Sequence, residues 1–94
     1  MHLLAWRRAV DETARVARSG CIFHRTPLRN RGATALMTKK AYGSDVVEIC
    51  FSEDDLLAAF SAARLSVIRS ILVEELSLPL DGGARMVTHV CKKI

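Results

Sequence analysis

Two pairs of potential metal ligands lie near opposite ends of the sequence. Cys21 and His24 are separated by two residues, and His89 and Cys91 by one. Four nitrogen and sulfur ligands suit a tetrahedral zinc ion. The two spacings are not those usual in zinc ribbons, however, and a cysteine on an apolar face is ordinarily a core residue. We therefore predict buried thiols and no metal, and keep a zinc-stabilised module as an alternative.

The same cysteines could act as nucleophiles only with more than a nearby histidine. Covalent catalysis also needs a group that orients the base and a site for the developing oxyanion. The sequence has no glycine-rich nucleotide-binding motif, no metalloprotease motif and no nucleophile elbow. We predict a protein that is not an enzyme and needs no cofactor.

Basic residues concentrate in the first half of the chain. Residues 1–44 carry nine Lys and Arg against two acids, and residues 45–94 carry five against eight, so charges of +7 and −3 sum to the net +4. This asymmetry favours an anionic partner, either an acidic protein face or a nucleic acid; the alternative is a solvated loop. The positions expected to contact the partner, with one aromatic residue for stacking, are Arg25, Arg29, Arg31, Lys39, Lys40 and Tyr42.

Arg64 is a further candidate contact. Counted at 100° per residue along a helix, it lies about 40° from Phe60, inside an apolar stripe. An arginine so placed usually extends its charged head to water over apolar neighbours. The alternative is an interface arginine that pairs with a carboxylate or a phosphate.

The first half of the chain contains one strong helical pattern. Apolar residues recur at three- and four-residue steps within residues 2–18, and Gly20 is a plausible stop. The residues of this apolar face are Leu3, Trp6, Val10, Ala14 and Ala17. Residues 21–25 form a short strand in this interpretation. Residues 26–44 show no periodic pattern of apolar residues and form a basic, partly flexible loop.

The second half predicts a strand, a long helix and a second strand. Residues 46–51 are β-branched and aromatic. Ser52 is placed to cap a helix by accepting from the Asp55 amide, and acids follow it in the first turn. The apolar stripe over residues 53–76 predicts that the helix continues to about residue 76. The stripe consists of Leu56, Phe60, Ala63, Val67 and Ile71.

These elements predict an α+β fold. After the turn at residues 81–83, residues 84–91 read as a strand, which gives a β-α-β core within residues 46–94. The N-terminal helix (1–20) and the basic connection (21–45) complete one domain. Two strands alone make a poor sheet, so either residues 21–25 contribute a third strand or a second subunit completes the sheet. The apolar arc on the long helix is broad, and we predict a homodimer.

The length and the cysteine content limit the class of protein. A chain of 94 residues is one domain, which excludes an enzyme with separate cofactor and substrate domains. No stretch approaches the roughly 18 apolar residues of a membrane span. Three cysteines and no secretory signal favour the cytoplasm. The alternative is a small mitochondrial matrix subunit, in which the arginine-rich residues 1–36 are a transit peptide; Met37 could also be an alternative start.

Overall fold

The computed structural model describes residues 5–76 and 82–94, and for residues 37, 39–41 and 46 it describes the backbone alone. The chain is an α+β fold whose strands pair almost entirely antiparallel. Its elements in chain order are α1 (Trp6–Val16), β1 (Gly20–Arg29), β2 (Ala35–Ala41), β3 (Ser44–Cys50), α2 (Glu53–Ala62), β4 (Leu65–Leu76) and β5 (Ala84–Lys93). Neither helix of the described residues is long and apolar enough to cross a membrane.

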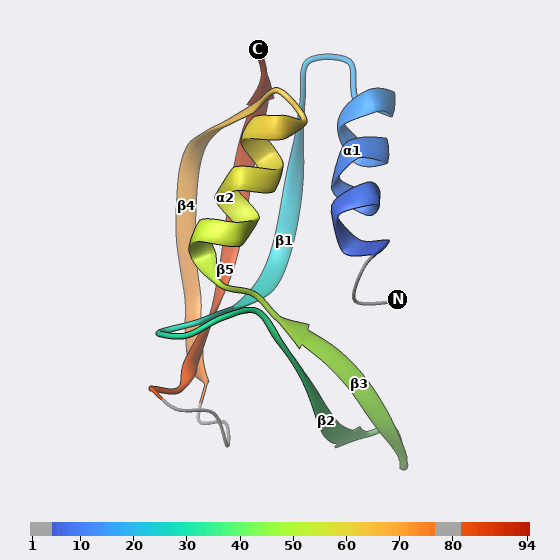
Figure 1. Ribbon diagram of the computed structural model, residues 1–94, viewed down its shortest axis with the longest axis vertical. Helices are drawn as coiled ribbons and strands as arrows, with labels where there is room; N and C mark the ends of the chain where they lie inside the picture. The colour runs from blue at the N-terminus through green and yellow to red at the C-terminus, as the bar shows by residue number, and fades with distance from the viewer. Residues whose placement is uncertain (1–4, 77–81) are drawn as a thin grey trace.

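The body of the molecule is a three-stranded sheet in the order β1-β5-β4 with both helices packed on one face (Figure 1). β2 and β3 form a separate hairpin that projects from the lower end of the body in this view. A parallel bridge between Leu28 and Phe51 joins the hairpin to β1, and the Phe51 amide donates to the Pro27 carbonyl at 2.9 Å. The hairpin is therefore an arm attached at its base.

The N-terminal helix is confirmed over its central turns. Trp6, Val10 and Ala14 are buried, as the three- and four-residue spacing predicts. The Trp6 ring meets the Phe51 ring edge-on, with centroids 4.8 Å apart. α1 thus covers the junction between the sheet and the arm.

The start of α2 is also confirmed. Ser52 is the N-cap, and its side chain accepts from the Asp55 amide at 3.4 Å. Thr34 reinforces this start, because its hydroxyl accepts from the Ser52 amide at 2.9 Å and donates to the Asp55 carboxylate at 2.8 Å. Glu53, Asp54 and Asp55 occupy the first turn, where acids oppose the helix dipole.

The predicted extent of this helix was wrong. α2 ends at Ala62, and Leu65–Leu76 form β4 instead. Arg64 adopts φ +60°, a left-handed conformation that ends the helix. The following residues are rich in Val and Ile, which favour strands, and they pair with β5 along its whole length.

The expected short strand at residues 21–25 is confirmed as part of β1, which extends to Arg29. The expected loop at residues 26–44 was wrong, because residues 35–41 form the strand β2. β2 pairs with β3 over seven residues, from Ala35 opposite Cys50 to Ala41 opposite Ser44. The two-residue turn at Tyr42 and Gly43 sets this register.

The β-α-β core does not form. The predicted strands at 46–51 and 84–91 both exist, as β3 and β5, but they lie in different sheets. β5 pairs antiparallel with β1 on one side and with β4 on the other. Residues 21–25 do join this sheet as part of β1, and its other outer strand, β4, comes from the stretch expected to be helical.

Candidate functional site

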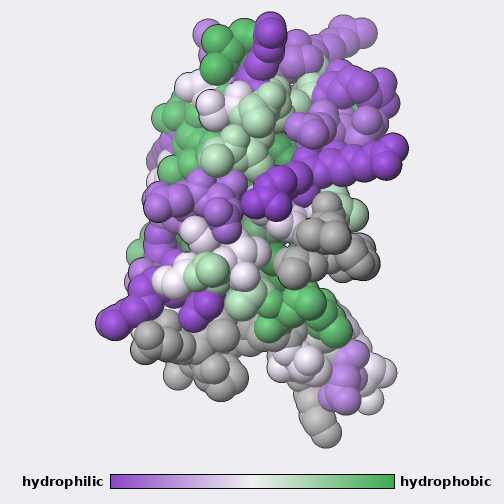
Figure 2. Space-filling model, viewed as in Figure 1, coloured by the Kyte–Doolittle hydropathy of each residue, from purple (hydrophilic) through white to green (hydrophobic). Residues whose placement is uncertain are grey.

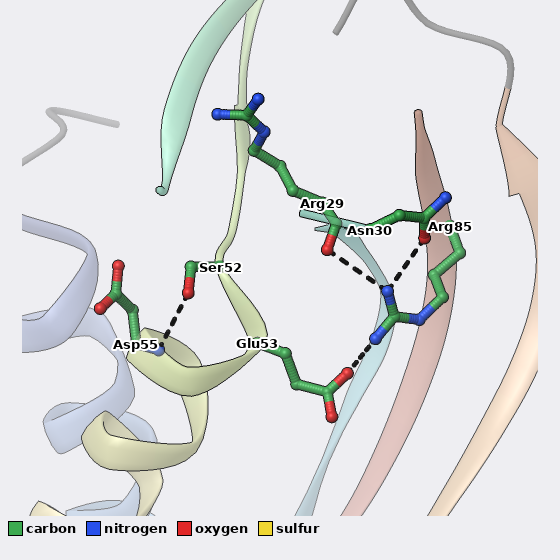
Figure 3. A network of polar contacts seen from close by, with 6 residues as sticks. All are labelled: Arg29, Asn30, Ser52, Glu53, Asp55 and Arg85. Carbon is green, nitrogen blue, oxygen red and sulfur yellow. Dashed lines mark hydrogen bonds and ion pairs between the residues drawn. The ribbon is translucent and has the colours of Figure 1, made fainter. Parts of the chain in front are cut away.

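Arg85 holds together the ends of three elements (Figure 3). Its Nη1 donates to the Asn30 side-chain oxygen at 3.0 Å and to the Arg29 carbonyl at 3.3 Å, and its Nη2 contacts the Glu53 carboxylate. β1, α2 and β5 therefore meet at one guanidinium. A polar cleft of 290 Å³ opens beside it, and Arg31 and Asp54 contribute to its walls. Three arginines and two acids line this cleft, and one of the arginines, Arg85, is paired with Glu53.

Arg25 lies on the helix-free face of the sheet, away from this cleft. It sits at an irregularity of β1 with φ +54°. Its Nη2 donates to the Glu74 carboxylate of β4 at 3.1 Å. The charge that the sequence assigned to an anionic partner is thus paired within the chain.

Arg29 and Arg31 follow at the end of β1. Arg29 donates through Nη1 to the Ala33 carbonyl at 2.7 Å and curls around Gly32. Arg31 is exposed and lies against Gly82 of the turn before β5. Both residues line the polar cleft, so the structure brings these two predicted contacts together.

Lys39, Lys40 and Tyr42 lie on the projecting arm. In the hairpin register Lys40 is opposite Asp45 and Lys39 is opposite Val46. The arm carries two lysines and two acids, so its charges balance. Tyr42 forms its tip with φ +55° and is fully exposed. The predicted basic stretch therefore spans three separate surfaces.

The sequence interpretation placed Arg64 in an apolar stripe of a helix. The structure does not. Arg64 is exposed in the turn between α2 and β4. Its carbonyl accepts from the Ile94 amide at 3.0 Å. Arg64 thus lies at the end of the body that also carries the last residue of the sequence, at the top of Figure 1.

Three further basic residues surround Arg64 at this end. Lys93 donates from its amide to the Ser19 carbonyl at 2.8 Å and from its Nζ to the Ala17 carbonyl at 2.9 Å. Lys92 is opposite Gly20 in the β1–β5 register. Arg18 lies between Ala17 and Ser19 in sequence and is exposed. We call Arg18, Arg64, Lys92 and Lys93 the basic end.

The basic end is unopposed by acids. The segments that build it, residues 13–24, 56–73 and 82–94, contain no Asp or Glu. Two large apolar side chains lie among the cations: Val16 is 68% exposed and Ile94 is 82% exposed. Figure 2 accordingly shows a mostly hydrophilic surface with a smaller hydrophobic patch at the top of the molecule. Sequence reasoning missed this surface because strand pairing, not local spacing, assembles it.

The four proposed zinc ligands do not converge. Cys21 is opposite Cys91, and both pack on the helix side of the sheet with His89. His24 is on the other face, where its Nδ1 lies 3.1 Å from the Thr88 hydroxyl. Among the described residues no group of three or more His, Cys, Asp or Glu side chains could hold a metal ion.

Burial controls the titration of the side chains on the helix side. Desolvation raises the pKa of the Cys91 thiol to about 11, and it raises the pKa of Cys21 and Cys50 as well. Desolvation lowers the pKa of His89, which is only 2% exposed. The thiols are therefore poor nucleophiles at neutral pH, and His89 is a neutral imidazole.

Comparisons of the chain with protein-family models, with curated proteins and with solved structures found no match.

Proposed function

We propose that this protein is a small non-enzymatic binding module that docks an acidic partner protein through its basic end. The observation that carries the proposal is the meeting of Arg18, Arg64, Lys92 and Lys93 at one end of the body, in segments without a single acid. Opposite charges across an interface speed encounter and fix orientation. Lys93 is half-buried on α1, whereas the other three cations are exposed and have no ion-pair partner among the described residues.

An acidic protein fits this end better than a nucleic acid does. Val16 and Ile94 expose apolar side chains among the cations. A protein interface buries such groups at its centre and keeps charges at the rim. A phosphate backbone pairs with the basic side chains but leaves the apolar groups exposed to water. The exposed aromatic residue that could stack on a base, Tyr42, lies on the arm at the other end of the body.

The backbone at Arg64 supports a binding role. A non-glycine residue at φ +60° costs roughly 1 kcal/mol, and glycine would remove that cost. Strained backbone of this kind is often found at binding sites, and at Arg64 it coincides with an exposed cation that has no ion-pair partner among the described residues. Its proximity to the carboxyl end of α2 offsets part of the cost, because a cation there opposes the helix dipole.

The test compares Arg64→Gly with Arg8→Ala, which removes one charge from the exposed face of α1 away from the basic end. Fluorescence anisotropy measures binding of a labelled peptide of alternating Glu and Leu, of polyglutamate and of a DNA duplex. We expect the Glu-Leu peptide to bind the native chain most tightly and Arg64→Gly to weaken it several-fold, with unchanged or raised stability. Arg8→Ala should bind as the native chain does. Equal binding by both variants, or tightest binding of DNA with a steep salt dependence, would overturn the proposal.

We also propose that two copies assemble through the free edge of β4. β4 is an outer strand of the sheet, and all eight residues from Ile68 to Glu75 are exposed. Monomeric proteins normally shorten, charge or cover such edges. The exposed apolar side chains along it are Ile68, Ile71, Leu72 and Val73, and Figure 2 shows hydrophobic atoms on the upper part of the side where β4 runs, with hydrophilic atoms below them.

The charges on β4 match an antiparallel second copy. Irregularities at Val67/Arg69 and Leu72/Glu74 leave a regular run, Arg69–Leu72, between them. Antiparallel pairing about this run places Arg69 of each copy opposite Leu72 of the other and diagonal to Glu74, which Arg25 of its own chain also contacts. Opposite charges on long side chains at such diagonal positions stabilise the pairing. Arg69 has no ion-pair partner among the described residues of its own chain.

Light scattering at micromolar concentration tests this assembly. The native chain should have the mass of two chains. Ile71→Lys should have the mass of one, because the added ammonium lies at the centre of the paired apolar strands, where burying a charge is costly. Ile22→Lys is the matched control, since Ile22 is an exposed isoleucine on β1, and it should remain a dimer. A native chain with the mass of a monomer at micromolar concentration would contradict the assembly.

A further inference from the structure

A groove runs between α2 and the adjoining strands on the helix side of the sheet. Its volume is 410 Å³, within the range of about 300–1,000 Å³ typical of small-molecule sites. Leu57 of α2 forms one side, and Val67 and Leu72 of β4 and Val87 of β5 form much of the rest. Leu57 is 37% exposed and Leu72 is 56% exposed, so both groove-lining side chains remain open to solvent.

His89 is the polar group in this apolar wall. It lines the groove, is 98% buried and meets the Phe60 ring edge-on with centroids 5.5 Å apart. Its Nδ1 is buried and has no hydrogen-bond partner among the described residues. A buried polar atom left without a partner costs about 1–3 kcal/mol, and such atoms in native structures need an explanation.

The charged residues at one end of the groove are already satisfied. Glu53 and Arg85 both line it, and they are bound to each other. The second terminal nitrogen of Arg85 is taken by Asn30 and by the Arg29 carbonyl. The charge of each residue is therefore neutralised within the chain and does not attract a charged ligand. An occupant of the groove therefore meets a surface that is apolar and uncharged except for that closed ion pair.

We propose that this groove binds a small neutral molecule with a mostly apolar body and one hydrogen-bonding group that is presented to His89. A neutral imidazole carries one donor and one acceptor nitrogen, so it accepts from a hydroxyl or donates to a carbonyl. The apolar body removes Leu57 and Leu72 from water. Ser70 of β4, which also lines the groove, is available to a second polar atom of the ligand.

This site is independent of the basic end, but it shares Leu72 with the β4 edge. It lies on the helix side of the sheet, whereas the docking surface lies at the end of the body and the proposed pairing uses the outer edge of β4. A ligand in the groove and a partner at the basic end contact different residues. Failure of one proposal therefore leaves the other unaffected.

The test uses 4-propylphenol and propylbenzene, which share an apolar body and differ by one hydroxyl. Nuclear magnetic resonance follows the ring nitrogens of His89 in the full chain during titration with each compound. We expect 4-propylphenol to saturate, to shift the His89 nitrogens and to bind at least tenfold more tightly than propylbenzene. Equal affinities of the two compounds, or saturation without a change at His89, would overturn the proposal.

Matched variants separate the hydrogen bond from the shape of the groove. His89→Phe should bind both compounds with similar affinity, because it keeps an aromatic ring and removes the polar nitrogens. His24→Phe makes the same change on the other face of the sheet and should leave the tenfold preference intact. An affinity that falls as the protein concentration rises would show that a second copy fills the groove, which also contradicts the proposal. If His89→Phe does not fold, the comparison of the two compounds on the native chain decides alone.

Discussion

Cys21 of β1 and Cys91 of β5 are Cα partners in the antiparallel register, although about three quarters of the chain lies between them. Directly opposed residues in such a pair have Cα atoms about 4.5–5.5 Å apart, which lies within the range of disulfides. Both thiols are free, and both face the core beneath the helices. Strand pairing has thus built a disulfide-compatible site that the residue spacing does not reveal.

Oxidation should join these two cysteines and stabilise the fold. A long closed loop predicts a gain of about 4 kcal/mol in the free energy of unfolding. The reaction with oxidised glutathione should be slow, because burial raises the pKa of Cys91 to about 11 and leaves little thiolate. Peptide mass mapping identifies the bond, and urea unfolding measures the gain. Cys50→Ala should oxidise in the same way; a disulfide that includes Cys50 would contradict the prediction.

Replacing Tyr42 at the tip of the arm should stabilise the hairpin. Tyr42 and Gly43 have φ of +55° and +75°, the pattern of a turn that favours Asn-Gly. Tyr42→Asn should raise hairpin stability by up to about 1 kcal/mol, or roughly fivefold in protection of the β2–β3 amides from hydrogen exchange. Tyr42→Phe keeps the unfavourable backbone and should leave protection unchanged. Lower protection in Tyr42→Asn would show that the tyrosine ring itself stabilises the arm.

The parts of the fold that the sequence predicted are those encoded within a few residues. The apolar spacing of α1 and the Ser52 cap of α2 are local signals, and both are confirmed. β3 and β5 were recognised because β-branched residues follow one another there. Neither β2 nor the full length of β1 was recognised, since residues 26–44 show no strand periodicity and their pairing depends on the distant strands β3 and β5.

The prediction of a long helix was wrong because the same apolar residues fit both the period of a helix and that of a strand. Leu56, Phe60 and Val67 lie on one face of a continuous helix, and Leu65, Val67 and Leu72 also suit a strand with an irregularity. Tertiary pairing with β5 decides between them. The same pairing assembles the basic end from Arg18, Arg64 and Lys92, so no spacing rule could have found that candidate site. The earlier basic candidates were chosen by proximity in sequence, which the fold does not preserve.

Removing the Arg85 side chain should destabilise the junction of β1, α2 and β5. Arg85→Met keeps most of the side-chain volume but leaves the Asn30 side chain and the Arg29 carbonyl without their donor. We expect a loss of about 1–2 kcal/mol in urea unfolding, since the site is partly exposed and water replaces some of these contacts. Glu53→Gln retains a neutral acceptor for Arg85 and should cost less. An equal loss of unfolding free energy in both variants would show that the ion pair between Arg85 and Glu53 supplies all of the stabilisation, which contradicts a contribution from the other two contacts.

His89 should make the folded state sensitive to mild acid. Burial lowers its pKa in the native chain, although Glu53 opposes this shift and Arg85 adds to it. The unfolded chain takes up a proton on this side chain below about pH 6.5, whereas the native chain does not until a lower pH. The unfolded state therefore binds more protons in that interval, and the free energy of unfolding falls as the pH is lowered through it.

The comparison of the native chain with His89→Phe isolates this contribution, because the carboxylates titrate alike in both. The free energy of unfolding of the native chain minus that of His89→Phe should fall by up to about 1.4 kcal/mol for each pH unit below pH 6.5. Between pH 7 and 8 the difference should be constant. Urea unfolding at half-unit steps of pH measures it. If the native chain instead becomes more stable relative to the variant as the pH falls, His89 is charged in the folded state and is bound to an acid.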